Sequence, residues 1–108
     1  MTVKEFAARH GMTVAAMPEG DREITGAYMG DLLSWVMGRA QSGDAWVTIM
    51  SNQNIVAVAT LADVACIILA EDVQPDEGVA ALAQQKGINL LRCPHSAFGI
   101  AGLLQEAL

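Results

Sequence analysis

Apolar runs of strand length alternate with apolar runs of helical period between Ile24 and Ala70, and this alternation constrains the fold more than any other feature. Two short polar connections, Met29–Asp31 and Ser51–Asn54, lie where a strand would pass into a helix. Such alternation is typical of a small α/β sheet. The two connections are also the only places in this stretch where a ligand would find hydrogen-bonding groups.

Capping residues, prolines and glycines mark where the expected helices begin and end. Asp31 is expected to cap the second helix, and Gln74–Glu77 is expected to start the fourth. Ile55–Asp63 also has the Val and Ile content of a strand, but the preceding Ser and Asn residues favour a helix that ends at Asp63. The expected helices are Thr2–His10, one opening at Gly30-Asp31, Ile55–Asp63, Gln74–Gln85 and Ala97–Leu108, the last capped by Ser96 with Phe98, Ala101, Leu104 and Leu108 on its buried face. The expected strands are Met12–Ala16 at an edge, Glu23–Ala27, Ala45–Met50, Val64–Leu69 and Ile88–Leu91.

Right-handed crossovers between successive strands require most of these strands to be parallel, with helices on both faces. The sequence therefore predicts a three-layer α/β/α domain with a mostly parallel sheet of about four to five strands. The continuous apolar run Val64–Leu69 is typical of a central strand buried on both faces.

The chain of 108 residues is expected to form one domain over residues 1–108. Its composition is 53% apolar and only 17% charged, which favours a homo-oligomer, most simply a homodimer, that hides the surplus apolar surface. The net charge of −6 and the lack of a Lys/Arg cluster argue against nucleic acid and an anionic membrane as partners.

The sequence indicates neither a membrane-spanning segment nor a secretion signal. The N-terminal residues carry charge throughout and lack an apolar signal-peptide core, and the longest apolar run, Ile55–Ala70, is interrupted by Asp63. Cys66 and Cys93 occur in different contexts and do not form a disulfide framework. A cytoplasmic protein is expected.

The turns that follow parallel strands meet at one edge of the sheet, where ligands bind in α/β proteins. This edge is expected to gather Tyr28–Asp31, Ser51–Asn54, Glu71–Gln74 and Arg92–Ser96. The candidate ligand-binding residues are Gly26, Tyr28, Gly30, Asp31, Ser51, Asn52 and Asn54.

Each candidate also has a purely structural interpretation. Gly26 and Gly30 would allow close approach of a phosphate, or would only serve turn geometry, and their spacing matches neither the dinucleotide fingerprint nor a P-loop. The neutral groups of Ser51, Asn52 and Asn54 suit a base, a ribose or a peptide backbone, or would only cap the following helix.

Cys93 and His95 resemble a nucleophile and its base, but the sequence nominates no orienting group or oxyanion hole, so loop packing is the favoured interpretation. Zinc would need three or four ligands, and no metal or cofactor is expected. Asp63 is more simply a helix-end residue than a catalytic acid. Trp35 and Trp46 are either core residues or a subunit contact, and Trp35, which lies between the apolar stripe positions of its helix, is the better interface candidate.

Nearly the whole chain resembles the DRTGG domain family. The resemblance is most specific at Gly26, Tyr28, Gly30-Asp31-Leu32-Leu33, Asn54, Ala57–Ala59 and Asp63, although the five-letter family string is absent and its nearest text is Asp21-Arg22 with Thr25-Gly26. The family is similar to the N-terminal domain of HPr kinase/phosphorylase and, by fold, to the first domain of MurF ligases. The resemblance implies a dimerisation and regulatory role beside CBS pairs in pyrophosphatases, and in phosphate acetyltransferases.

The leading hypothesis is a non-catalytic homodimeric module that senses a nucleotide or another small metabolite, or binds a larger enzyme. No GxxxxGK[ST] string occurs, so a kinase would have no phosphate cradle. The alternatives are a small enzyme that uses Cys93 and His95, and a structural protein–protein adaptor.

Overall fold

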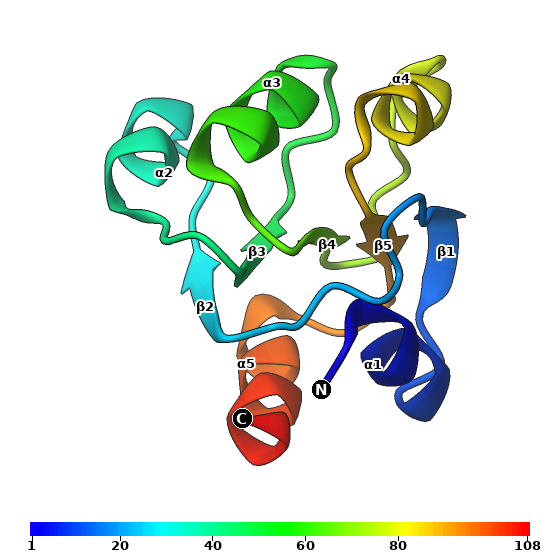
Figure 1. Cartoon of the computed structure of the whole chain (residues 1–108), viewed down its shortest axis with the longest axis vertical. Coiled ribbons are helices and arrows are strands. Elements are labelled where there is room, and N and C mark those ends of the chain that lie inside the picture. The colour runs from blue at the N-terminus through cyan, green and yellow to red at the C-terminus, as the bar shows by residue number, and fades with distance from the viewer.

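The computed structural model describes residues 1–108 and contains a five-stranded sheet in the order β1-β5-β4-β3-β2 (Figure 1). Four strands are parallel and the edge strand β1 is antiparallel to β5. The strands are β1 (Thr13–Ala16), β2 (Gly26–Met29), β3 (Asp44–Thr48), β4 (Cys66–Leu69) and β5 (Leu90–Arg92). The mostly parallel sheet and the edge position of β1 confirm two predictions.

Five helices cover both faces of the sheet, as the crossover rule predicts. Figure 1 shows α1 and α5 on one face and α2, α3 and α4 on the other. The helices are α1 (Val3–Arg9), α2 (Leu33–Arg39), α3 (Asn54–Ala62), α4 (Val79–Lys86) and α5 (Ala97–Ala107). The three-layer α/β/α architecture and the order of elements are therefore confirmed, including a helix at α3 where a strand was the alternative.

Alternating strand residues divide the core into two halves. Val47 and Ile68 pack towards α1 and α5, whereas Trp46 and Ile67 pack towards α2, α3 and α4. All four residues of β4 are buried, as expected for the central strand of the sheet. The longest helix has 11 residues, and no helix combines the length and hydrophobicity that crossing a bilayer requires.

Several helix ends follow the predicted local chemistry. The Thr2 side chain and Glu5 form a capping box at α1, and the Ser96 hydroxyl accepts the Gly99 N–H at α5. Asp63 ends α3 in the left-handed conformation, with φ of 58°, and Gly87 ends α4 with φ of 76°. Asp63 is therefore a helix-end residue, as predicted.

The predicted start of α4 is wrong. Residues 74–77 are not helical, and α4 begins at Val79 after Gly78, whose φ is 84°. The Asp76 N–H instead donates to the Ser51 carbonyl at 3.0 Å, which ties this segment to the turn after β3. A tertiary contact has overridden the local signal of a proline followed by acidic residues.

The second strand and the last helix also differ from expectation. Glu23 and Ile24 pair with the N-terminal residues instead of with β3, so β2 begins only at Gly26. The α5 face that packs on the sheet centres on Ile100 and Leu104, and the Phe98 side chain is 89% exposed. Leu108, at the other end of the predicted face, is 54% exposed, so the helical period is correct but the phase of the predicted buried face is wrong except at Leu104.

Candidate functional site

The turns after the four parallel strands meet at the carboxyl edge of the sheet, as predicted. The Gly30 N–H donates to the Val47 carbonyl at 3.1 Å, which joins the turn after β2 to β3. The Glu71 N–H donates to the His95 carbonyl at 2.8 Å, which joins the turns after β4 and β5. Backbone hydrogen bonds between neighbouring turns therefore hold this edge in place.

Asp31 is the central polar residue of this edge. One oxygen of its carboxylate, Oδ1, accepts hydrogen bonds from the Thr48 hydroxyl at 2.7 Å and from the Ile49 N–H at 3.0 Å. The prediction that Asp31 caps α2 is therefore wrong: Leu32 is the N-cap residue and makes no side-chain cap. The register of two neighbouring parallel strands brings the end of β3 within reach of the carboxylate, and the carboxylate binds there instead.

A small depression, here called the carboxyl-edge hollow, lies beside Asp31. Its volume is about 210 Å³, and its lining residues are Met29, Gly30, Asp31, Val47, Thr48, Ile49, Ala70 and Ala97. Exposed apolar side chains lie next to it in the sequence or line it: Leu32, Ile49 and Phe98 are 60%, 49% and 89% exposed. The hollow thus combines an apolar lining, one carboxylate and the start of α5.

The second predicted turn does not contribute to this hollow. The Ser51 hydroxyl donates to the Asp76 carboxylate at 2.8 Å, and Asn52 Oδ1 accepts the Asn54 N–H at 2.9 Å. Asn52 therefore has the structural role of closing the first turn of α3. The two turns follow neighbouring parallel strands, as predicted, but Asn54 faces a different depression from Asp31.

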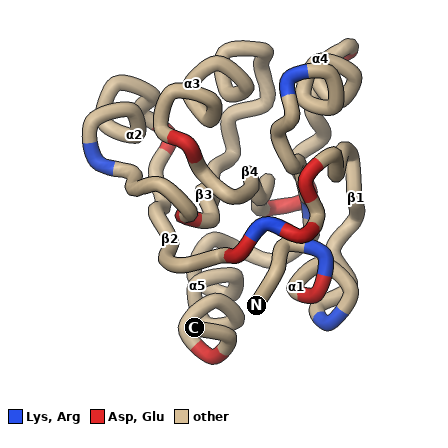
Figure 2. The backbone as a smooth tube through the Cα atoms, in the orientation of Figure 1, with Lys and Arg blue, Asp and Glu red and all other residues tan.

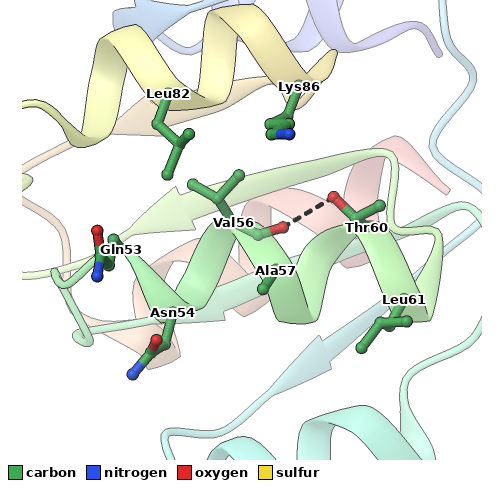
Figure 3. A pocket seen from close by; sticks show the side chains of 8 residues that line it. All are labelled: Gln53, Asn54, Val56, Ala57, Thr60, Leu61, Leu82 and Lys86. Atoms are coloured by element: carbon green, nitrogen blue, oxygen red, sulfur yellow. Dashed lines mark hydrogen bonds between the residues drawn. The ribbon is translucent and has the colours of Figure 1, made fainter.

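That second depression is a groove of about 520 Å³ between α3 and α4, here called the α3–α4 groove (Figure 3). Figure 3 shows Leu82 and Lys86 on one wall and the α3 side chains on the other. Its lining residues are Gln53, Asn54, Val56, Ala57, Thr60, Leu61, Leu82 and Lys86. Of these residues only Asn54 is a candidate from the sequence, because the two walls come from separate helices that share no motif.

Two other candidates lie away from the carboxyl-edge hollow. Gly26 is the first residue of β2 and therefore lies at the amino end of the sheet. A Cβ atom on Gly26 would lie 2.6 Å from Asp44 Oδ1, so packing accounts for this glycine. Tyr28 is half-buried and packs against the core on the side of α2, α3 and α4. Neither residue lines the hollow.

The two tryptophans have different environments. Trp46 has no exposed surface, and its indole N–H donates to the Gly30 carbonyl at 2.9 Å. Its predicted interface role is therefore wrong, because β3 is an internal strand of the sheet and places Trp46 in the core. Trp35 is 53% exposed, and the Arg39 guanidinium lies 3.9 Å from its ring centroid. Trp35 remains available for a contact with another molecule.

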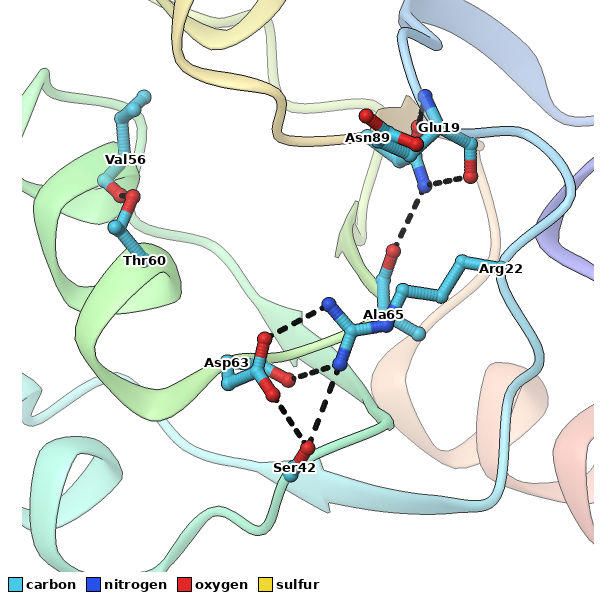
Figure 4. A network of polar contacts seen from close by, with 8 residues as sticks. All are labelled: Glu19, Arg22, Ser42, Val56, Thr60, Asp63, Ala65 and Asn89. Carbon is cyan, nitrogen blue, oxygen red and sulfur yellow. Dashed lines mark hydrogen bonds and ion pairs between the residues drawn. The ribbon is translucent and has the colours of Figure 1, made fainter.

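The amino end of the sheet holds a polar cluster of Arg22, Ser42 and Asp63 (Figure 4). The Arg22 guanidinium donates to the Asp63 carboxylate at 2.9 Å and to the Asp63 carbonyl at 2.7 Å, and the Ser42 hydroxyl donates to the same carboxylate at 2.5 Å. These contacts, first the bond from Arg22 and then that from Ser42, hold the pKa of Asp63 below its usual value. No depression is lined by these three residues.

The cysteines do not have the environment of a nucleophile. Burial raises the pKa of the Cys93 thiol, and it raises the pKa of Cys66 to about 12. No hydrogen bond joins the side chains of Cys93 and His95, and the His95 side chain is exposed whereas Cys93 is buried. A catalytic thiol requires a lowered pKa, so the geometry argues against the Cys93–His95 enzyme.

The fold is similar to that of a solved structure, and the sequence matches the model of a protein family. The fold is similar to that of the CBS and DRTGG domains of the regulatory region of Clostridium perfringens pyrophosphatase, solved in complex with its activator diadenosine tetraphosphate. The TM-score is 0.71 at 16% identity, over 99% of this chain and 47% of that one, so this chain spans about half the length of that regulatory region. No curated protein matches the sequence. The model of the DRTGG domain matches residues 24–107, and the chain therefore belongs to the DRTGG domain family.

Proposed function

We propose that this protein is a non-catalytic regulatory module that binds a nucleotide at the carboxyl-edge hollow. The observation that carries the proposal is the Asp31 carboxylate, which is fixed by Thr48 and Ile49 through Oδ1 and keeps Oδ2 without a protein partner. Family membership supports a regulatory role, and the similar pyrophosphatase region binds a dinucleotide. The burial of Cys93, which raises the pKa of its thiol, argues against the alternative of a thiol enzyme.

The chemistry of the hollow suits the nucleoside part of such a ligand. A carboxylate accepts hydrogen bonds from ribose hydroxyls, as acidic residues do in dinucleotide-binding folds. The first N–H groups of α5, at Ala97 and Phe98, have no partner in the protein and favour an anion such as phosphate. The Phe98 ring, 89% exposed, offers a surface on which a base could stack.

The size of the hollow sets a limit on what it encloses. At about 210 Å³ it is smaller than the roughly 300–1,000 Å³ of typical ligand sites. We infer that it holds one nucleoside, and that the rest of a dinucleotide would extend over the exposed apolar side chains beside it. A second copy of the chain facing the same ligand would then enclose it, which connects ligand binding with the predicted homodimer.

Calorimetric titration with adenosine, ATP and diadenosine tetraphosphate tests the proposal. Asp31→Asn is expected to weaken binding about tenfold, because it removes the charge that accepts the ribose hydroxyls while it keeps an acceptor for Thr48. The control is Asp21→Asn, which removes the same charge from a residue of the exposed loop between β1 and β2 that does not line the hollow. No binding at about 1 mM ligand, or equal loss in both variants, would contradict the nucleotide site.

Sedimentation with and without ligand tests the proposed coupling to assembly. If the ligand shifts an association equilibrium, the fraction of dimer must change with ligand concentration, because a ligand shifts an equilibrium only by binding one state more tightly. A monomer that binds nucleotide and stays a monomer would remove the dimer half of the proposal. A chain that binds no nucleotide would be left with the role of a protein–protein adaptor.

A further inference from the structure

The three helices on one face of the sheet have an unusual charge distribution. All of the chain's 12 acidic residues lie outside α2, α3 and α4, although the net charge of the whole chain is −6. The only charged residues within these helices are Arg39 and Lys86 (Figure 2). Neither takes part in an ion pair. The three helices themselves therefore carry only positive charge on an otherwise acidic molecule, and nearby acidic residues such as Asp63 after α3 and Glu77 before α4 lie at their ends.

The same layer exposes large apolar side chains. Leu61 on α3 is 70% exposed, Trp35 on α2 is 53% exposed and Met37 on α2 is 47% exposed. Of the seven residues of α2, only Val36 is buried. A helix that buries so little of its apolar surface within its own domain leaves that surface available for a partner.

The α3–α4 groove continues this exposed surface and supplies polar groups at its two ends. Gln53 and Asn54 lie at one end, and their side-chain amides make no hydrogen bond within the protein. Lys86 lies at the other end on α4, and Val56, Ala57 and Leu82 line the part between (Figure 3). The Thr60 hydroxyl is already bonded to the Val56 carbonyl at 2.9 Å, so Lys86 and the two amides are the groups left to bind a partner.

We propose that the outer face of α2, α3 and α4 is a docking surface for an acidic amphipathic helix of a partner protein. A partner helix over the groove would place its apolar stripe on Leu61 and Leu82 and carboxylates towards Lys86, and carboxylates on its opposite side would extend over α3 towards Arg39 on α2. The partner's chemistry follows from charge complementarity: an acidic segment meets the two charges that α2, α3 and α4 carry, Arg39 and Lys86, and its carboxylates would be directed away from Glu77 before α4. This proposal rests on the proposed role as a regulatory module and names the kind of partner it would control.

A second copy of this chain is a poorer occupant of the same face. Symmetric pairing of the two layers would place Arg39 and Lys86 of one copy near those of the other, and like charges across an interface are unfavourable. The acidic residues of a second copy lie in other helices and in loops, so a charge-matched contact would be head-to-tail and would build a ring or a filament and not a simple symmetric dimer. The distribution of charge therefore favours a different protein.

Two synthetic helical peptides test the proposal. Both carry leucines at i, i+3 and i+7 spacing, flanked by glutamates in one and by lysines in the other. The acidic peptide is expected to bind at least about tenfold more tightly than the basic one, because its charges complement Lys86 and Arg39. Calorimetry gives the two affinities, and a blue shift of Trp35 emission reports docking, since Trp46 is already buried.

Variants of the chain separate the contributions. Leu61→Glu is expected to lower the affinity for the acidic peptide more than about tenfold. Lys86→Glu should lower the affinity for the acidic peptide and raise the affinity for the basic one. Loss of folding would lower both affinities. The matched controls are Leu108→Glu and Arg9→Glu, which change an apolar residue of 54% exposure and an unpaired cation on other elements, and both should bind the acidic peptide as the wild type does.

Other outcomes overturn the proposal. Equal affinity for the two peptides, no binding of the acidic peptide at about 1 mM, or equal losses in the control variants would each contradict it. Self-association of the chain that Leu61→Glu abolishes would assign the face to a second copy instead. Nucleotide titration of Leu61→Glu keeps the two proposals apart, because the nucleotide site is expected to survive this change.

Discussion

The two ends of the sheet are built from similar polar turns and use them differently. At the amino end, Arg22, Ser42 and Asp63 bind one another, and no depression is lined by them. At the carboxyl end, Asp31 keeps one oxygen without a protein partner beside a hollow of about 210 Å³. The polar cluster at the amino end is satisfied within itself, whereas at the carboxyl end Ser51 and Asn52 bind within the protein and Asp31 keeps one oxygen available to a ligand.

Connectivity explains this difference. At the carboxyl end β2, β3 and β5 pass into helices through short turns, and only β4 is followed by a longer segment, Ala70–Gly78, so the turns leave space between them. At the amino end the long connection from β1 to β2 crosses the sheet, and Arg22 and Glu19 on it reach the starts of other strands. The comparison predicts that substitutions at the amino end cost stability and that substitutions at the carboxyl end cost binding.

The largest expected effect is that of Asn89→Ala at the amino end. Asn89 is 1% exposed, and its amide donates to the carbonyls of Glu19 and Ala65 and accepts the Glu19 N–H, all at 2.9 Å. Leaving these buried groups without partners should lower the free energy of unfolding by about 3 kcal/mol. Chemical denaturation measures this loss. Asn52→Ala at the carboxyl end is the control and should cost about 1 kcal/mol or less, as for an exposed cap.

A second test concerns glycine at the amino end. Gly26→Ala would place a Cβ atom 2.6 Å from Asp44 Oδ1, and Asp44 is only 6% exposed and is held by the Gln41 N–H. This overpacking should cost about 2 kcal/mol in thermal or chemical unfolding. Gly102→Ala in α5 meets no atom within 4 Å and should instead stabilise the helix by up to about 1 kcal/mol. Similar effects from both substitutions would remove the packing explanation for Gly26.

The smallest effect is the pH dependence that Asp63 contributes. Its pKa is lowered in the folded state by Arg22 and Ser42, so its stabilisation is fully present above the unfolded value of about 3.9 and is lost as the pH falls through the lower folded pKa. The side chains of Arg22 and Asp63 are 32% and 60% exposed, so the contribution should stay below about 1 kcal/mol.

The difference in unfolding free energy between wild type and Asp63→Asn, followed from about pH 6 to pH 2, measures this contribution. The difference should shrink as the pH falls. The capping-box carboxylate Glu5 also has a lowered pKa, but it is present in both proteins and cancels from the difference. A difference that stays constant with pH would show that the charge of Asp63 does not stabilise the fold.

Local signals in the sequence predicted most of the fold correctly. Thr2, Ser96 and Gly87 occur at helix ends because capping depends on neighbouring backbone groups alone. The parallel sheet followed from the alternation of strands and helices. The failures at Asp31 and Gln74–Glu77 have a shared cause: their polar groups bind the turn after β3, a contact that only the folded chain creates.

The sequence predicted the edge of the sheet at which the turns gather, but only some of the residues that line the hollow there. The predicted parallel topology requires the turns with Gly30, Asp31 and Ser51 to lie at one edge, and the structure places them there. The sequence predicts that Asn52 and Asn54 share a site with Asp31, but Asn52 bonds to the start of α3 and Asn54 lines the α3–α4 groove. The direction of a turn side chain depends on local backbone geometry, which composition does not determine. Lys86 and Leu61 had no signal in the sequence, because an exposed residue on an amphipathic helix looks the same with or without a partner.

The most direct test of the central claim is a backbone amide NMR titration with diadenosine tetraphosphate. The account predicts that the perturbed signals map to the carboxyl edge, at residues 29–31, 47–50 and 96–98, while Arg22, Ser42 and Asp63 stay unchanged. Perturbations clustered at the amino end, or none at about 1 mM ligand, would contradict the division between a structural end and a binding end.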